Sequence, residues 1–252
     1  MSKPKAAICS LTSCAGCQSM LLNVEKALGN IFSKLDFVYF PLIKRENELK
    51  KYDFCFIEGA VTNKEQVKLI KHLRKKSRFV VAFGTCATYG GIASIQDFEN
   101  ETLAEEVYGS KISRISDTVQ GIGNYINVDY YMRGCPVIKD ELLKTIDFFE
   151  QMKIPPDYEL PVCVECRKKG NRCLLAVDHL PCMGAITYGG CDALCTSQGI
   201  PCQGCRGPLP SANVDARVKV FEKFGMSKED IRRRFIKFAG TSKKFRRILK
   251  EL

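Results

Sequence analysis

Fourteen cysteines occur in this 252-residue chain, and twelve of them fall into three sets of four. In chain order, the first set is Cys14, Cys17, Cys86 and Cys135, the second set is Cys163, Cys166, Cys173 and Cys182, and the third set is Cys191, Cys195, Cys202 and Cys205. Four thiolates are the usual ligands of an iron–sulfur cluster or a structural zinc ion. Three such sets in one chain favour electron transfer over a fold merely held together by metal.

Composition places the chain among soluble globular proteins, with 45% hydrophobic and 27% charged residues. The first residues lack the charged region, apolar stretch and cleavage site of a secretory signal, and no run of about eighteen apolar residues occurs. We therefore expect a cytoplasmic protein without a membrane anchor. Disulfides are rare in that reducing compartment, so metal binding explains the cysteines better than disulfide bonds do.

The formal net charge of +11 raises the alternative of a zinc-containing protein that binds nucleic acid. This charge counts every cysteine as neutral, whereas a four-iron cluster with its four thiolates carries about −2. The remaining excess lies in runs such as Lys64–Arg78 and Lys237–Lys250, which are typical of solvated helix faces. We therefore expect no nucleic-acid partner and keep this class as a distant alternative.

Strands and helices alternate through the first half of the chain. Short apolar runs predict strands at Lys5–Cys9, Asp36–Phe40, Tyr52–Ile57, Arg78–Phe83 and Tyr130–Met132. Helical patterns are found at Gln18–Leu35, Lys64–Lys76 and Lys139–Met152. This alternation predicts an α/β fold with a doubly wound parallel sheet.

The first set of cysteines follows the ends of three predicted strands. Cys14 and Cys17 come after the first strand. Cys86 follows the fourth strand and Cys135 the fifth. Because ligands gather at the carboxyl ends of parallel strands, we expect these cysteines to form a single site.

Cys14-Ala-Gly-Cys17 has two other interpretations. A thioredoxin-like redox pair uses the same C-x-x-C spacing, but it leaves Cys86 and Cys135 without a role. Flavin binding would place Thr12 near a phosphate, yet the Gly/Thr-rich run that usually cradles a phosphate is missing. A cluster beside a helix N-terminus, where the dipole favours thiolates, is the preferred interpretation.

The character of the chain changes after a proline-rich linker, Ile154–Pro161. Residues 162–210 are rich in cysteine, glycine and proline and show little periodicity, so metal binding would supply the stability that a small core lacks. Residues 211–252 return to helix, with Ser227 and Asp230 as a capping pair before Ile231–Ala239. We predict two domains, residues 1–153 and 162–252.

Spacing alone leaves two questions open for the second and third sets. Zinc accepts the same tetrahedral thiolates as iron, so zinc knuckles are the alternative to clusters. Chain order does not prove which cysteines share a metal, so the two sets could interleave. His179, three residues before Cys182, is an alternative ligand that we do not favour.

Three further residues have interpretations of their own. Cys9 and Cys55 lie inside strand-like runs and are predicted to be core residues. Glu58 at the end of the third strand is either a functional acid, for proton relay or partner contact, or a solvated strand-end acid. The sequence shows no Ser-His-Asp set, phosphate loop or dinucleotide fingerprint, and we expect no complete catalytic centre in this chain.

Taken together, the motifs resemble those of the small subunit of [NiFe] hydrogenases, over residues 5–208. The segments that carry the resemblance are Cys14-Ala-Gly-Cys17, Gly84-Thr-Cys86-Ala, Gly134-Cys135-Pro136 and Cys202-Gln-Gly-Cys205-Arg-Gly-Pro208. The chain is most similar to the short cytoplasmic branch, especially the delta subunits of archaeal sulfhydrogenases, which are soluble NAD(P)-linked hydrogenases. Gamma-type small subunits of deazaflavin-reducing and heterodisulfide-reductase-linked hydrogenases are the alternative.

This resemblance implies a flavodoxin-like domain, residues 1–153, in which the first set holds the proximal cluster. It implies an irregular iron–sulfur domain with C-terminal helices, residues 162–252, in which the second set holds the distal and the third set the medial cluster. Cys163 stands where the membrane-bound branch has histidine, and Cys195 offers a fourth medial ligand. We therefore expect three [4Fe–4S] clusters.

The implied function is that of an electron-transfer subunit. Hydrogen chemistry would take place in a nickel–iron large subunit, the alpha-like partner. Electrons would pass between that partner, an iron–sulfur subunit (beta-like) and a flavoprotein that handles NAD(P)H (gamma-like).

Overall fold

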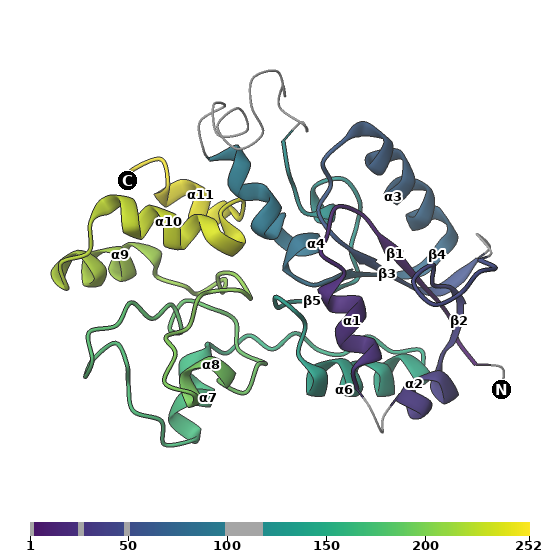
Figure 1. Cartoon of the computed structure of the whole chain (residues 1–252), viewed down its shortest axis with the longest axis horizontal. Coiled ribbons are helices and arrows are strands. Elements are labelled where there is room, and N and C mark those ends of the chain that lie inside the picture. Colours follow the sequence, from purple (N-terminus) through teal and green to yellow (C-terminus); the bar gives the residue numbers. More distant parts are fainter. Residues whose placement is uncertain (1–2, 25–27, 48–50, 99–117) are drawn as a thin grey trace.

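The computed structural model describes residues 3–24, 28–47, 51–98 and 118–252. Five parallel strands form one sheet in the order β2-β1-β3-β4-β5 (Figure 1). The strands are β1 (Lys5–Ser10), β2 (Asp36–Tyr39), β3 (Tyr52–Glu58), β4 (Ser77–Phe83) and β5 (Tyr130–Met132). This is the strand order of flavodoxin-like folds, and the predicted parallel α/β sheet is confirmed.

Helices cover both faces of the sheet, because its apolar side chains alternate between the faces. On β1, Ala6 and Ile8 belong to one buried cluster and Ala7 and Cys9 to the other. The first cluster includes side chains of α1 (Gly16–Leu22), α2 (Leu28–Lys34) and α6 (Lys139–Glu150). The second includes side chains of α3 (Lys64–Lys76). The sheet is thus the middle layer of three, as the continuous apolar strands require.

One predicted helix, Gln18–Leu35, is not continuous in the structure. It is divided into α1 and α2, and residues 25–27 between them lie outside the described part of the chain. Asn23 ends α1, and its backbone N–H donates to the carbonyl of Ser19. Asparagine is a weak helix former, and the apolar periodicity alone does not reveal this stop.

The second half contains more helix than the sequence indicates. Two short helices lie within the expected irregular segment, and three more follow: α7 (Val162–Lys168), α8 (Leu194–Ser197), α9 (Val214–Lys223), α10 (Lys228–Ala239) and α11 (Lys243–Ile248). The predicted cap of α10 is confirmed, because the Ser227 hydroxyl accepts the Asp230 N–H at 3.1 Å. None of the described helices is long and apolar enough to cross a membrane.

A separate hydrophobic cluster supports this half, centred on the side chains of α9, α10 and α11. Phe235 and Phe245 meet edge to face there, with ring centroids 4.8 Å apart. Short helical pieces of the first half complete the described elements: α4 (Thr85–Tyr89), η2 (Gly91–Asp97) and η3 (Ile122–Asn124). The boundary between the two domains stays a prediction.

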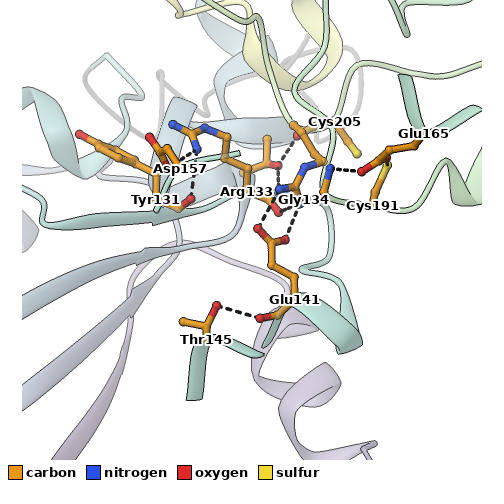
Figure 2. Close-up of polar contacts among 12 residues, drawn as sticks. Tyr131, Arg133, Gly134, Glu141, Thr145, Asp157, Glu165, Cys191 and Cys205 are labelled. Carbon is orange, nitrogen blue, oxygen red and sulfur yellow. Dashed lines mark hydrogen bonds and ion pairs between the residues drawn. The ribbon is translucent and has the colours of Figure 1, made fainter. Parts of the chain in front are cut away.

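A buried ion pair links the two halves. The Arg206 guanidinium donates to both carboxylate oxygens of Glu141 on α6, at 2.6 and 2.8 Å. It also donates to the carbonyl of Arg133 at 2.6 Å. The Arg206 side chain is 3% exposed and that of Glu141 is 16% exposed. Figure 2 shows Glu141 beside the Arg133–Gly134 backbone at the carboxyl end of β5.

We predict that Glu141→Ala lowers the free energy of unfolding by about 3–5 kcal/mol, because it leaves the Arg206 charge buried without its partner. Denaturant unfolding measures this change. The control is Glu229→Ala, which removes the partner of Arg233 in an exposed pair on α10 and should cost less than about 1 kcal/mol. Equal effects of the two substitutions would show that the buried pair stabilises the fold no more than the exposed pair does.

Candidate metal centres

The first set of cysteines gathers at the carboxyl edge of the sheet, as predicted. Cys14 and Cys17 lie at the start of α1, just after β1. Cys86 lies in α4 after β4, and Cys135 follows β5. Parallel strands end at one edge, so three distant segments deliver their thiols to one place.

The thiols of this set lie within electrostatic range of one another. The pKa of Cys86 is raised to about 11, first by burial and then by the neighbouring Cys135 and Cys14. The pKa of Cys17 is also raised, by burial above all, with contributions from Glu58, Cys86 and Cys135. These couplings bring the four thiols near one another, and their joint role as ligands stays a prediction.

Two glycines leave space around these sulfur atoms. Gly84 has φ +91°, and a Cβ there would overlap the Sγ of Cys17. Gly91 has φ +58°, and a Cβ there would lie 2.6 Å from the Sγ of Cys86. Only glycine adopts these backbone conformations without strain and also leaves room beside the thiols.

Glu58 is not a solvated strand-end acid, which was one of its two interpretations. It is 2% exposed at the end of β3. Its carboxylate accepts the backbone N–H of Cys17 at 2.9 Å and the side-chain amide of Gln18. Glu58 therefore holds the Cys14–Cys17 turn against the sheet, and its role in proton relay stays a prediction.

The second set lines a cavity of its own, of about 40 Å³. Cys163 and Cys166 lie on α7 three positions apart, and this spacing puts both on one helix face. Cys173 and Cys182 come from the following loop and line the same cavity. The pKa of Cys163 is raised to about 11 by burial, while the charge of Arg217 opposes the rise.

The third set lines another cavity, of about 430 Å³. Its four cysteines are joined there by Cys135 of the first set. The pKa of Cys191 is raised to about 11, by burial first and then by the charge of Glu165. Each of the two cavities thus contains one complete set in chain order, which supports the separate sets over interleaved ones.

The three sets form a continuous row. Cys135 of the first set and Cys205 of the third interact electrostatically. At the other end of the third set, the Cys202 N–H donates to the Sγ of Cys182 at 3.3 Å. The third set therefore lies between the other two.

Buried charges flank the third set. Glu165 on α7 accepts the backbone N–H groups of Gly190 at 2.6 Å and Ala193 at 3.1 Å, which fixes the loop that carries Cys191. Figure 2 shows the Glu165 carboxylate beside Cys191. Arg206 also lies within electrostatic range of Cys191. One carboxylate thus shapes the loop while one guanidinium supplies positive charge near the thiols.

The donor sets fit iron–sulfur clusters, which cysteine thiolates bind in fours. Arg217, which lines the cavity of the second set, adds an independent sign of a fit. It is 9% exposed, and its Nε and Nη1 atoms have no hydrogen-bond partner among the described residues. An anionic group in the cavity would supply one. Within the same part of the chain, no group of three or more His, Cys, Asp or Glu side chains is arranged as ligands of a single metal ion.

Burial and ring contacts describe the other residues that the sequence analysis singled out. Cys9 and Cys55 are 4% and 0% exposed within their strands, as expected of core residues. The ring of His179 stacks on Phe224, with centroids 4.6 Å apart. Sequence reasoning missed three charged residues beside the thiols: Glu165, Arg206 and Arg217. Two of them adjoin cysteines in the sequence, but nothing in the pattern separates them from surface charges.

Comparison with known proteins finds subunits of hydrogenases among the relatives of this chain. The chain is 29% identical to sulfhydrogenase 2 subunit delta of Pyrococcus furiosus, over 93% of this chain and 99% of that protein. It is 32% identical to a subunit of the F420-non-reducing hydrogenase vhu of Methanocaldococcus jannaschii, over 81% of each chain. A chain from the structure of an NAD⁺-reducing [NiFe]-hydrogenase in the H₂-reduced state is similar with a TM-score of 0.54 and 25% identity, over 62% of this chain and 95% of that one.

The family described as NADH ubiquinone oxidoreductase, 20 Kd subunit, matches residues 14–149. This match covers more than half of the chain and contains the whole first set of cysteines. The chain therefore belongs to the NADH ubiquinone oxidoreductase 20 Kd subunit family, and its hydrogenase relatives confirm the resemblance to small subunits of [NiFe]-type hydrogenases.

Proposed function

We propose that this chain is the electron-transfer subunit of a cytoplasmic [NiFe] hydrogenase complex. The observation that carries the proposal is the continuous row of three thiol sets, in the order first, third and second. Three bound [4Fe–4S] clusters would supply one-electron redox steps along this row. The splitting or formation of hydrogen is assigned to a nickel–iron large subunit, in keeping with the hydrogenase complexes named for the relatives.

The fold controls the protonation of the thiols before any metal binds. Burial raises the pKa of Cys86, Cys163 and Cys191 to about 11 each, so the metal-free thiols are protonated at neutral pH. Metal binds the thiolate, and assembly of each centre must therefore displace protons. Afterwards the buried Arg206 and Arg217 would supply positive charge beside the anionic centres.

The direction of electron flow follows from which set meets which partner. Cys14 and Cys135 of the first set are exposed, as is Cys173 of the second, so both ends of the row reach the surface. Cys195 in the middle is exposed too, and exposure alone does not fix the direction. We assign the large subunit to the first set, the proximal position implied by the family resemblance. The second set then faces the electron acceptor.

The acceptor is proposed from the relatives. Sulfhydrogenase subunit delta is similar over nearly its whole length, and this favours an iron–sulfur subunit and a flavoprotein that handles NAD(P)H. The similarity to a subunit of an F420-non-reducing hydrogenase supports the alternative, a gamma-type small subunit that serves a heterodisulfide-reductase-linked partner. Reduction of NAD(P)⁺ by hydrogen in the intact complex distinguishes the two.

We predict that the protein purified without oxygen contains about twelve irons and about twelve acid-labile sulfides per chain, since each four-cysteine set would hold one [4Fe–4S] cluster. Elemental analysis and a sulfide assay measure both contents. An electron paramagnetic resonance spectrum of the reduced protein should show interacting paramagnetic centres. Two or three zinc ions without sulfide would contradict the electron-transfer function and favour the zinc-protein alternative.

We predict that Cys14→Ser, in the assembled complex, lowers hydrogen-coupled reduction of an external dye because the row loses a thiolate ligand at its first set. The loss should exceed the roughly 10- to 100-fold effect of removing an outer-shell partner of a metal site. Cys55→Ala is the matched control, since Cys55 is a buried cysteine outside the three sets. Full dye reduction by Cys14→Ser, with the nickel content unchanged, would contradict the assignment of the first set.

A further inference from the structure

Arg217 is a buried cation whose contacts within the described chain leave part of its guanidinium without a partner. It lies on α9, a helix capped by Asn213, whose side chain accepts the Ala216 N–H at 2.9 Å. The arginine points away from solvent and is 9% exposed, whereas Lys219 on the same helix is exposed. Its guanidinium lies 5.7 Å from the ring centroid of Phe221, which is the next turn of the helix.

The buried guanidinium has unused donors. Neither Nε nor Nη1 has a hydrogen-bond partner among the described residues, although both atoms are shielded from water. A charged group buried without partners opposes folding unless an anion compensates it. The nearby Phe221 ring attracts the cation but accepts no conventional hydrogen bond, so the two N–H groups remain available.

The lining of the cavity indicates which group could accept hydrogen bonds from Arg217. Among the described residues around this cavity, Arg217 is the one with a charged side chain, and no carboxylate lines it. The other polar lining consists of Thr196 and the thiols of the second set, Cys163, Cys166, Cys173 and Cys182. Arg217 also acts electrostatically on Cys163. A negative centre bound by these four thiols would therefore lie next to the unused donors.

We propose that Arg217 donates hydrogen bonds from Nε and Nη1 to sulfur atoms of the cluster bound by the second set and thereby raises its reduction potential. This inference rests on the proposed function and assigns Arg217 a positioning and tuning role at the end of the row that faces the acceptor.

The direction of the effect follows from charge. Reduction adds one electron and takes a [4Fe–4S] centre with its four thiolates from about −2 to about −3. A fixed cation and two N–H donors stabilise the more negative state more strongly. Hydrogen bonds to the sulfur atoms are among the factors that set cluster potentials. Arg217 therefore favours the electron residing at the second set, from which the acceptor takes it.

The test is a potentiometric titration of the anaerobic complex, followed by electron paramagnetic resonance. In Arg217→Met, we expect one cluster to become harder to reduce by about tenfold in its equilibrium constant, which is about 59 mV for a one-electron couple. Arg217→Lys keeps the charge without the planar fork of donors and should give a smaller shift of the same sign. Lys219→Met removes an exposed cation from the same helix and should leave every potential unchanged.

The outcomes separate this inference from the proposed function. Wild-type potentials in Arg217→Met, with full iron content, overturn the role of Arg217 and leave the electron-transfer function standing. If Arg217→Met loses iron, Arg217→Lys decides: a lowered potential supports the role, and a wild-type potential overturns it. A wild-type protein that holds zinc without sulfide overturns both.

Discussion

The structure depends on bringing four thiols together from three strand ends that are distant in the sequence. A parallel sheet meets this constraint, because β1, β4 and β5 all end at one edge. Each loop that leaves this edge then has little room: Gly84 and Gly91 lie so close to sulfur that a side chain would collide with it. The buried Glu58 carboxylate fixes the turn between Cys14 and Cys17 through a backbone N–H. The fold of the first half is thus shaped by its site as much as by its core.

The second half also brings thiols together, but it does so without a sheet. It has no sheet edge on which to collect thiols, so short helices and backbone hydrogen bonds set their spacing. One turn of α7 presents Cys163 and Cys166 on one face, and the Glu165 carboxylate between them holds the loop that leads to Cys191. Neighbouring thiol sets therefore share a supporting group, because a residue on the helix of the second set holds the loop of the third.

The fold was largely predictable from the sequence, because its strands are apolar on both faces and its helices show clear periodicity. β3, β4 and α3 lie within one residue of their expected bounds. The break between α1 and α2 was not predicted, since apolar residues recur across it at helical spacing. The helices of the cysteine-rich segment were missed because they show too little apolar periodicity. Both α7 and α8 are short, and cysteines occupy positions that would otherwise show an apolar pattern.

The thiol sets could be predicted from residue type and spacing, but their charged surroundings could not. Helical spacing from Val214 places Arg217 on the buried face of α9 and leaves Lys219 toward solvent, but it does not reveal that the arginine lines the cavity of the second set. Likewise Lys237 lies within electrostatic range of Cys135, and Arg234 within range of Cys182, although both lie on the basic helix α10. Part of the excess of +11 therefore lies close to the thiols. Positive charge in these places would offset the negative charge of the centres that the thiols are proposed to hold, so it has a structural explanation within the chain itself.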